Sequence, residues 1–142
     1  MVDPWLIGSE IDGFSWFNEQ WHATEPVAIS DLPPLDYLLI SQSYEDHCHL
    51  PTLRELDNKY PYLASGKAAQ RLNKKFPQAD VTALPEWPEA PLKVGDLEIL
   101  CLHPGRKLDP VYYAILIAYQ GKAVVYASHG FALTENQISD IS

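Results

Sequence analysis

The chain has 142 residues, of which 46% are hydrophobic, so it can bury one core of ordinary size and we expect a single domain over residues 1–142. Its 10 Lys and Arg against 19 Asp and Glu give a net charge of -9, and the longest basic run is Lys74-Lys75, which argues against direct binding of nucleic acid. The absence of a long apolar run and of a signal-peptide pattern argues against a membrane protein. Two cysteines, Cys48 and Cys101, are too few for a secreted disulfide framework, so we expect a soluble protein of the reducing cytoplasm.

The first 34 residues are rich in aromatic side chains and prolines but show no sustained period. Trp5, Trp16 and Trp21 occur here together with Phe14 and Phe17. This pattern predicts an irregular loop that its aromatic side chains pin to the protein.

A buried strand is predicted next, over residues 35–40, because the run Leu-Asp-Tyr-Leu-Leu-Ile is short and mostly apolar. A helix is expected to begin near Leu50-Pro51-Thr52, since proline suits the first helical turn. Leu53 and Leu56 would face the core.

The remaining elements follow in close succession. A helix over residues 66–76 has apolar side chains at helical spacing and basic residues near its end. The turn Gln120-Gly121-Lys122 predicts a hairpin, and Thr134 with Gln137 has the spacing of a capping box at the start of a last helix. Strands are predicted over residues 62–65, 81–84, 97–102, 112–119 and 123–127.

Between the first strand and the first helix lies the densest group of polar and ionisable residues, SQSYEDHCHLPTL at positions 41–53. Glu45, Asp46, His47 and His49 would emerge at the carboxyl end of a strand, where α/β sheets place their chemistry. Carboxylates and imidazoles are metal ligands. Cys48 would point away from the two histidines as a small buried thiol.

The segment Gln42-Ser43-Tyr44-Glu45-Asp46-His47 resembles the second motif of the metallo-β-lactamase superfamily, H-x-H-x-D-H, in its last two positions. Asp3-Pro4-Trp5-Leu6 is similar to the D-P-W-L of the branch that contains ascorbate-6-phosphate lactonase-like proteins and homologues of cyanobacteria and plants. The resemblance implies an α/β fold, the αββα sandwich, present in part and lacking the first strands and the last strand and helix. Residues 138–142 would lead into a further strand.

The same resemblance implies that one of the family's two metal sites is lost. Gln42, Tyr44 and Arg106 stand where the first metal has histidines. The second site keeps Asp46 and His47, while His129 replaces its bridging aspartate.

His49 and His103 are further candidate ligands on this reading. The cofactor would be one divalent ion, zinc, manganese or iron. The alternative is a metal-free pocket in which histidines hydrogen-bond to Asp46 and Glu45.

Two functions remain open at this stage. In the first, the protein is a metal-dependent hydrolase of an ester, lactone or phosphoester, with Asp46, His47 and His129 on the metal and with Tyr44 or Arg106 orienting an anionic substrate. In the second, it is a non-catalytic relative that binds a small anion or a protein. Exposed sheet edges would favour a homodimer, and the compartment would be the plastid stroma if the source is a plant.

Overall fold

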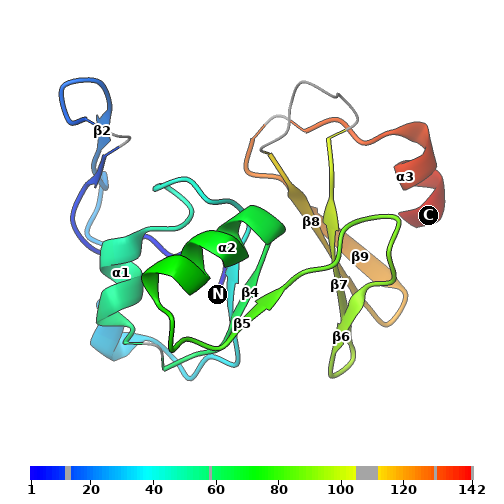
Figure 1. Ribbon diagram of the computed structural model, residues 1–142, viewed down its shortest axis with the longest axis horizontal. Helices are drawn as coiled ribbons and strands as arrows, with labels where there is room; N and C mark the ends of the chain where they lie inside the picture. The colour runs from blue at the N-terminus through cyan, green and yellow to red at the C-terminus, as the bar shows by residue number, and fades with distance from the viewer. Residues whose placement is uncertain (12–13, 58, 105–111, 130, 142) are drawn as a thin grey trace. The chain divides into compact units, whose positions relative to one another are not determined.

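The computed structural model describes residues 1–11, 14–57, 59–104, 112–129 and 131–141. They form two compact units, Met1–Thr82 and Ala83–Ser142, each with its own sheet (Figure 1). The fold is mixed α/β, as the sequence predicts.

The first unit is built on a three-stranded sheet of order β3-β4-β5. The strands are β3 (Leu38–Ile40), β4 (Tyr62–Ala64) and β5 (Val81–Ala83), and β3 and β4 run parallel. All six residues of β3 and β4 are buried, which fits the continuous apolar character expected of parallel strands. Three predicted strands are thereby confirmed, with β3 starting later than its apolar run.

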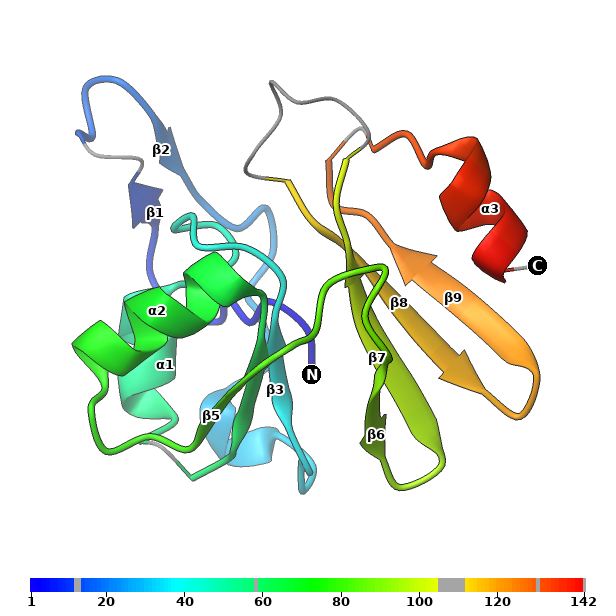
Figure 2. The ribbon, with the colours of Figure 1, turned by 45° about the vertical axis from the view of Figure 1, so that its right-hand side comes forward.

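Two helices connect these strands and lie on one side of the sheet, α1 (Leu50–Glu55) and α2 (Gly66–Lys75) (Figures 1 and 2). Pro51 occupies the first turn of α1 as predicted. Leu53 of α1 and Leu72 of α2 are fully buried in the same core as the β3 side chains. The helices therefore cover the sheet face formed by alternate strand residues.

The amino-terminal segment departs from the prediction. It contains a short antiparallel pair, β1 (Glu10–Ile11) and β2 (Glu19–Gln20), and a 3-10 turn at Ile29–Asp31. Trp16 is 81% exposed, and three further aromatic side chains near it are exposed as well: Phe14, Phe17 and Trp21. The prediction that these four side chains pin the loop is wrong, because they are exposed, and Trp16 packs only against its neighbours Phe14 and Phe17 in the ring contacts described.

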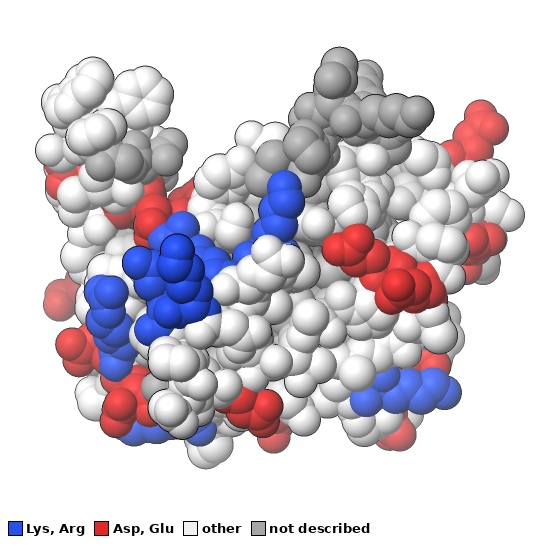
Figure 3. Space-filling model, viewed as in Figure 1, with Lys and Arg blue, Asp and Glu red and all other residues white. Residues whose placement is uncertain are grey.

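Charge is distributed unevenly over the first unit. Lysine and arginine side chains gather over α2 (Figure 3), although the whole chain is acidic.

The second unit is a four-stranded antiparallel meander of order β6-β7-β8-β9. Its strands are β6 (Leu92–Val94), β7 (Leu97–Leu102), β8 (Ala114–Tyr119) and β9 (Lys122–Tyr126). Gln120 and Gly121 form the β8–β9 turn with φ of 48° and 74°, the positive values that a two-residue hairpin requires. The sequence predicted β7, β8 and β9 but missed β6, for which no element was predicted.

Helix α3 (Glu135–Ile141) ends the described chain. Its capping box is formed as predicted, because the Thr134 backbone N–H donates to the Gln137 side chain at 2.9 Å and the Gln137 backbone N–H donates to Thr134 Oγ1 at 3.2 Å. Residues 138–141 therefore belong to the predicted last helix, and the expectation that residues 138–142 lead into a further strand stays a prediction.

Among the described residues, none of the helices has the length and apolar character needed to cross a bilayer.

Candidate metal site in the first unit

The candidate site lies in the turn between β3 and α1. The Tyr44 backbone carbonyl accepts hydrogen bonds from the backbone N–H groups of His47, at 3.1 Å, and Cys48, at 2.6 Å. These bonds close a compact turn that carries Asp46 and His47. The motif thus emerges at the carboxyl end of β3, where the sequence places it.

Asp3 lies beside this turn because the first residues of the chain run along β3. The Leu39 N–H donates to the Met1 carbonyl at 2.8 Å, and the Asp3 N–H donates to the Leu39 carbonyl at 2.9 Å. The Asp3 carboxylate then accepts hydrogen bonds from the backbone N–H of Ser41, at 2.7 Å, and from the Ser41 hydroxyl. Asp3 is therefore anchored at the strand end.

The same carboxylate orients His47. His47 Nδ1 lies 2.8 Å from Asp3 Oδ2. Since an ionised carboxylate only accepts hydrogen bonds, Nδ1 carries the proton and the lone pair of a neutral His47 is on Nε2. This arrangement of carboxylate and histidine is the one that commonly supports a metal-binding imidazole.

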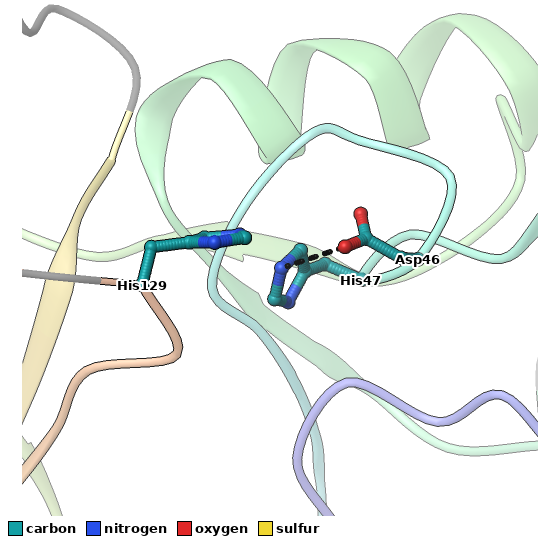
Figure 4. Close-up of side chains that lie close together, drawn as sticks. All are labelled: Asp46, His47 and His129. Atoms are coloured by element: carbon teal, nitrogen blue, oxygen red, sulfur yellow. Dashed lines mark ion pairs between the residues drawn. The ribbon is translucent and has the colours of Figure 1, made fainter. Parts of the chain in front are cut away.

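The second nitrogen of His47 faces the other motif residue. Nε2 lies 3.4 Å from Asp46 Oδ2, and Figure 4 shows the two side chains with this ion pair dashed. Burial opposes the charged form of His47, but the hydrogen bond and charge of Asp3 and the charge of Asp46 outweigh it, so the pKa of His47 is raised above its ordinary value. His47 is 6% exposed, whereas about a third of the Asp46 side chain is exposed.

The spacing of this pair fits two ligands of one ion. Atoms bound tetrahedrally at about 2.1 Å from a zinc ion lie about 3.4 Å from each other. His47 Nε2 and Asp46 Oδ2 have that separation. An imidazole nitrogen and a carboxylate oxygen are also a donor set that zinc, manganese and iron accept.

His49 has a different role, as the cap of α1. Its Nδ1 accepts from the Thr52 backbone N–H at 3.3 Å and lies 2.9 Å from Thr52 Oγ1, while Nε2 lies 3.3 Å from the Ser9 carbonyl oxygen. Both ring nitrogens are thus used within the protein. Burial lowers the pKa of His49, which favours the neutral ring that this pattern needs.

Cys48 is the buried thiol that the sequence predicts. It is fully buried, and burial raises its pKa to about 12. It contacts Arg71, which also forms an ion pair with Glu45. Glu45 is therefore paired with Arg71, whereas the contact between His47 and Asp46 is one that the metal-free alternative also expects.

The other predicted residues come from several parts of the chain. Gln42 is buried at the end of β3, and Tyr44 is 38% exposed. Arg106 lies outside the described residues. His129 follows β9 in the second unit, is exposed, and packs its ring against Tyr112 at 4.8 Å between centroids; it is also drawn in Figure 4.

His103, also in the second unit, is paired with a carboxylate. Its Nε2 lies 2.7 Å from Glu86 Oε2, and its ring lies 4.7 Å from that of Tyr113. The Glu86 carboxylate is thus the partner that the sequence did not suggest for His103.

Sequence reasoning did not assign a role to Asp3. The only signal in the sequence was the D-P-W-L segment, whose resemblance to the family does not predict what the Asp3 carboxylate contacts. The pairing of residues 1–3 with β3, which brings Asp3 to His47 across 44 positions, is visible only in the structure.

A comparison with known families gives a clear result: the sequence profile described as "Beta-lactamase superfamily domain" matches residues 2–139. The chain belongs to this family. No curated protein matches the sequence. Among solved structures, a metallo hydrolase from the hyperthermophilic archaeon Ignicoccus hospitalis, Igni18, is similar with a TM-score of 0.49 and 16% identity. The match covers 71% of this chain and 44% of that chain, so this chain spans less than half the length of Igni18.

Proposed function

We propose that this family member is a metal-dependent hydrolase in which Asp46 and His47 hold one divalent ion and Asp3 positions His47. The observation that carries the proposal is the hydrogen bond of 2.8 Å between Asp3 and His47 Nδ1, together with the 3.4 Å between His47 Nε2 and Asp46. A purely structural histidine does not require a second carboxylate at its other nitrogen. The expected substrates are esters, lactones or phosphoesters.

The third protein ligand in this proposal is His129. Three protein ligands with one open position are typical of catalytic zinc sites. His49 is left out because both of its nitrogens are hydrogen-bonded within the first unit, and His103 because its Nε2 is paired with Glu86. His129 follows a strand and is exposed, which suits a ligand that needs contact with solvent or substrate.

Asp3 and the residues of the turn would have separate roles in the reaction. Asp3 keeps the proton of His47 on Nδ1, so that Nε2 can donate its lone pair. A divalent ion, when bound, would supply Lewis acidity and lower the pKa of a bound water. Tyr44, which is partly exposed in the same turn, and Arg106 are proposed to orient an anionic substrate.

A second candidate function is favoured by Gln42. This buried amide and Tyr44 replace the two leading histidines of the family motif, and neither is a good zinc ligand. A protein that has lost one metal site could retain the fold as a binding module for a small anion.

Metal analysis of the purified protein separates the two functions. After incubation with zinc, manganese or iron and removal of the excess, we expect about one equivalent in the wild type and none in a variant with Asp46→Ala and His47→Ala. Asp80→Ala, an exposed carboxylate on the same unit, is the matched control and should retain the metal. His103→Ala tests the alternative ligand and should also retain it.

Activity completes the test. Chromogenic esters, lactones and phosphoesters should be hydrolysed only by the forms that retain the metal. A protein that binds no metal, or whose metal content is unchanged in the double variant, would contradict the hydrolase and leave the binding module.

A further inference from the structure

A polar groove lies beside the candidate site, on the surface of the first unit. Its volume is about 560 Å³, which is sufficient for a small molecule. Two of its lining residues, Ser43 and Glu45, belong to the turn that carries Asp46, and the others come from the end and one face of α2: Lys67, Gln70, Arg71, Lys74 and Lys75.

The charge of this groove is opposite to that of the chain. Four of its lining residues are cationic and one, Glu45, is acidic, whereas the whole chain carries a net charge of -9. Lys67, Arg71 and Lys74 follow one another at spacings of four and three residues, which places them on one face of α2. Like charges at these spacings destabilise a helix, so a ligand that neutralises them would be favoured.

The groove combines a fixed cation with adaptable ones. The guanidinium of Arg71 is held by Glu45 and contacts Cys48, and only about a quarter of its side chain is exposed. Lys74 and Lys75 are exposed and end in flexible ammonium groups. One anchored guanidinium and several mobile ammonium groups suit a compact anion with more than one negative charge, such as a phosphate.

We infer that this groove, the α2 groove, binds the phosphate group of a small phosphorylated molecule. The inference rests on the proposed function in one respect, that this molecule is the substrate. Glu45 and Asp46 are adjacent, with Cα atoms about 3.8 Å apart, so a phosphate in the α2 groove leaves the rest of a small molecule within reach of Asp46 and His47. The α2 groove thereby determines substrate class, while the turn would hold the reacting bond.

A nucleic acid backbone offers the same chemistry but fits the protein less well. Backbone binding requires cations spread along a surface, and outside the α2 groove the chain is strongly acidic. We therefore assign the α2 groove to a small molecule, and the test includes a single-stranded oligonucleotide as a competitor.

The test measures pyrophosphate binding by titration calorimetry at fixed ionic strength, with a chelator present so that no metal contributes. The test variant carries Lys67→Gln and Lys74→Gln, and the matched control carries Lys59→Gln and Lys122→Gln, two exposed lysines outside the α2 groove. All four positions are exposed, so folding should be preserved, and circular dichroism checks it. We expect wild type and control to bind alike and the test variant to bind about five- to tenfold more weakly.

The inference is overturned by no binding by the wild type at millimolar pyrophosphate, by equal binding of the test variant and the control, or by tighter binding of the oligonucleotide than of pyrophosphate. The variant with Asp46→Ala and His47→Ala keeps this result apart from the hydrolase. It should lose metal and still bind pyrophosphate, whereas the test variant should keep its metal. Loss of pyrophosphate binding in the Asp46 and His47 variant would place the anion at the turn and contradict the α2 groove.

Discussion

The turn between β3 and α1 carries two histidines, His47 and His49, which differ in what their ring nitrogens contact. Asp3 holds His47 Nδ1, and the other nitrogen of His47 faces the Asp46 carboxylate. His49 uses both nitrogens to join Thr52 and Ser9.

This difference separates a residue suited to chemistry from one suited to stability. His47 has a carboxylate at each nitrogen, so a cation between His47 and Asp46 would be stabilised. His49 has only neutral partners and a lowered pKa, so a cation there would be destabilised. The sequence does not distinguish His47 from His49, but their electrostatic surroundings in the folded protein are opposite.

The largest expected effect is on metal affinity when each histidine is replaced in turn. His47→Ala should abolish stoichiometric metal binding, because it removes a ligand, while His49→Asn should retain it, because asparagine can still cap α1. Competition with a chromogenic chelator measures both affinities. Equal loss of metal affinity in the two variants would mean that His47 and His49 do not differ in metal binding.

Asp3→Asn should have the next largest effect. The amide can still accept a hydrogen bond but lacks the charge that stabilises the orientation and basicity of His47. Loss of such a partner typically costs about 10–100-fold in metal affinity. A variant that binds metal as tightly as the wild type would show that Asp3 is only a structural anchor for Ser41.

His49→Ala should lower the free energy of unfolding by about 1–3 kcal/mol, because it removes the cap of α1 and leaves Thr52 and Ser9 without their buried partner. Urea unfolding of the metal-free protein measures this change. His49→Asn should recover part of the loss. No loss in the alanine variant would mean that the cap adds nothing to stability.

The smallest expected effect is on the pH dependence of stability. The pKa of His49 is lowered in the folded protein, so the unfolded chain takes up a proton more readily and stability falls as the pH drops below about 6.5. The pKa of His47 is raised, so its contribution is present at low pH and is lost as the pH rises through that value.

Variants of the metal-free protein can separate the opposite contributions of His47 and His49 to the pH dependence of stability. His49→Asn should make stability fall less between about pH 6.5 and pH 5, and Asp3→Asn should make it fall more, because the favourable contribution of a charged His47 is reduced. Urea midpoints across this range provide the measurement. If the pH dependence of stability changed in the same direction in both variants, the pKa shifts of His47 and His49 would not be opposite.

The sequence predicted most of the fold for physical reasons that are local. The apolar run before the turn, the proline at the start of α1 and the Thr134–Gln137 capping box act over a few residues, and each formed its element, although β3 is shorter than its apolar run. β6 was missed because Leu92–Val94 is too short to show alternation and follows several prolines.

The site was only half predictable. Asp46 and His47 are adjacent in the sequence and stand in a recognisable motif, but their supporting contacts join distant positions. Asp3 reaches His47 across 44 positions and Arg71 reaches Glu45 across 26, so no local pattern could reveal them. The prediction for the aromatic residues near Trp16 was wrong for a related reason, since composition alone does not show which surface an aromatic side chain contacts.

Anomalous scattering from a metal-soaked crystal tests the central claim most directly, because it reports occupancy and ligands together. We expect a peak about 2.1 Å from His47 Nε2 and beside the Asp46 carboxylate, with His47 Nδ1 still bonded to Asp3. A crystal without such a peak, or with its peak at His49 or His103, would contradict it.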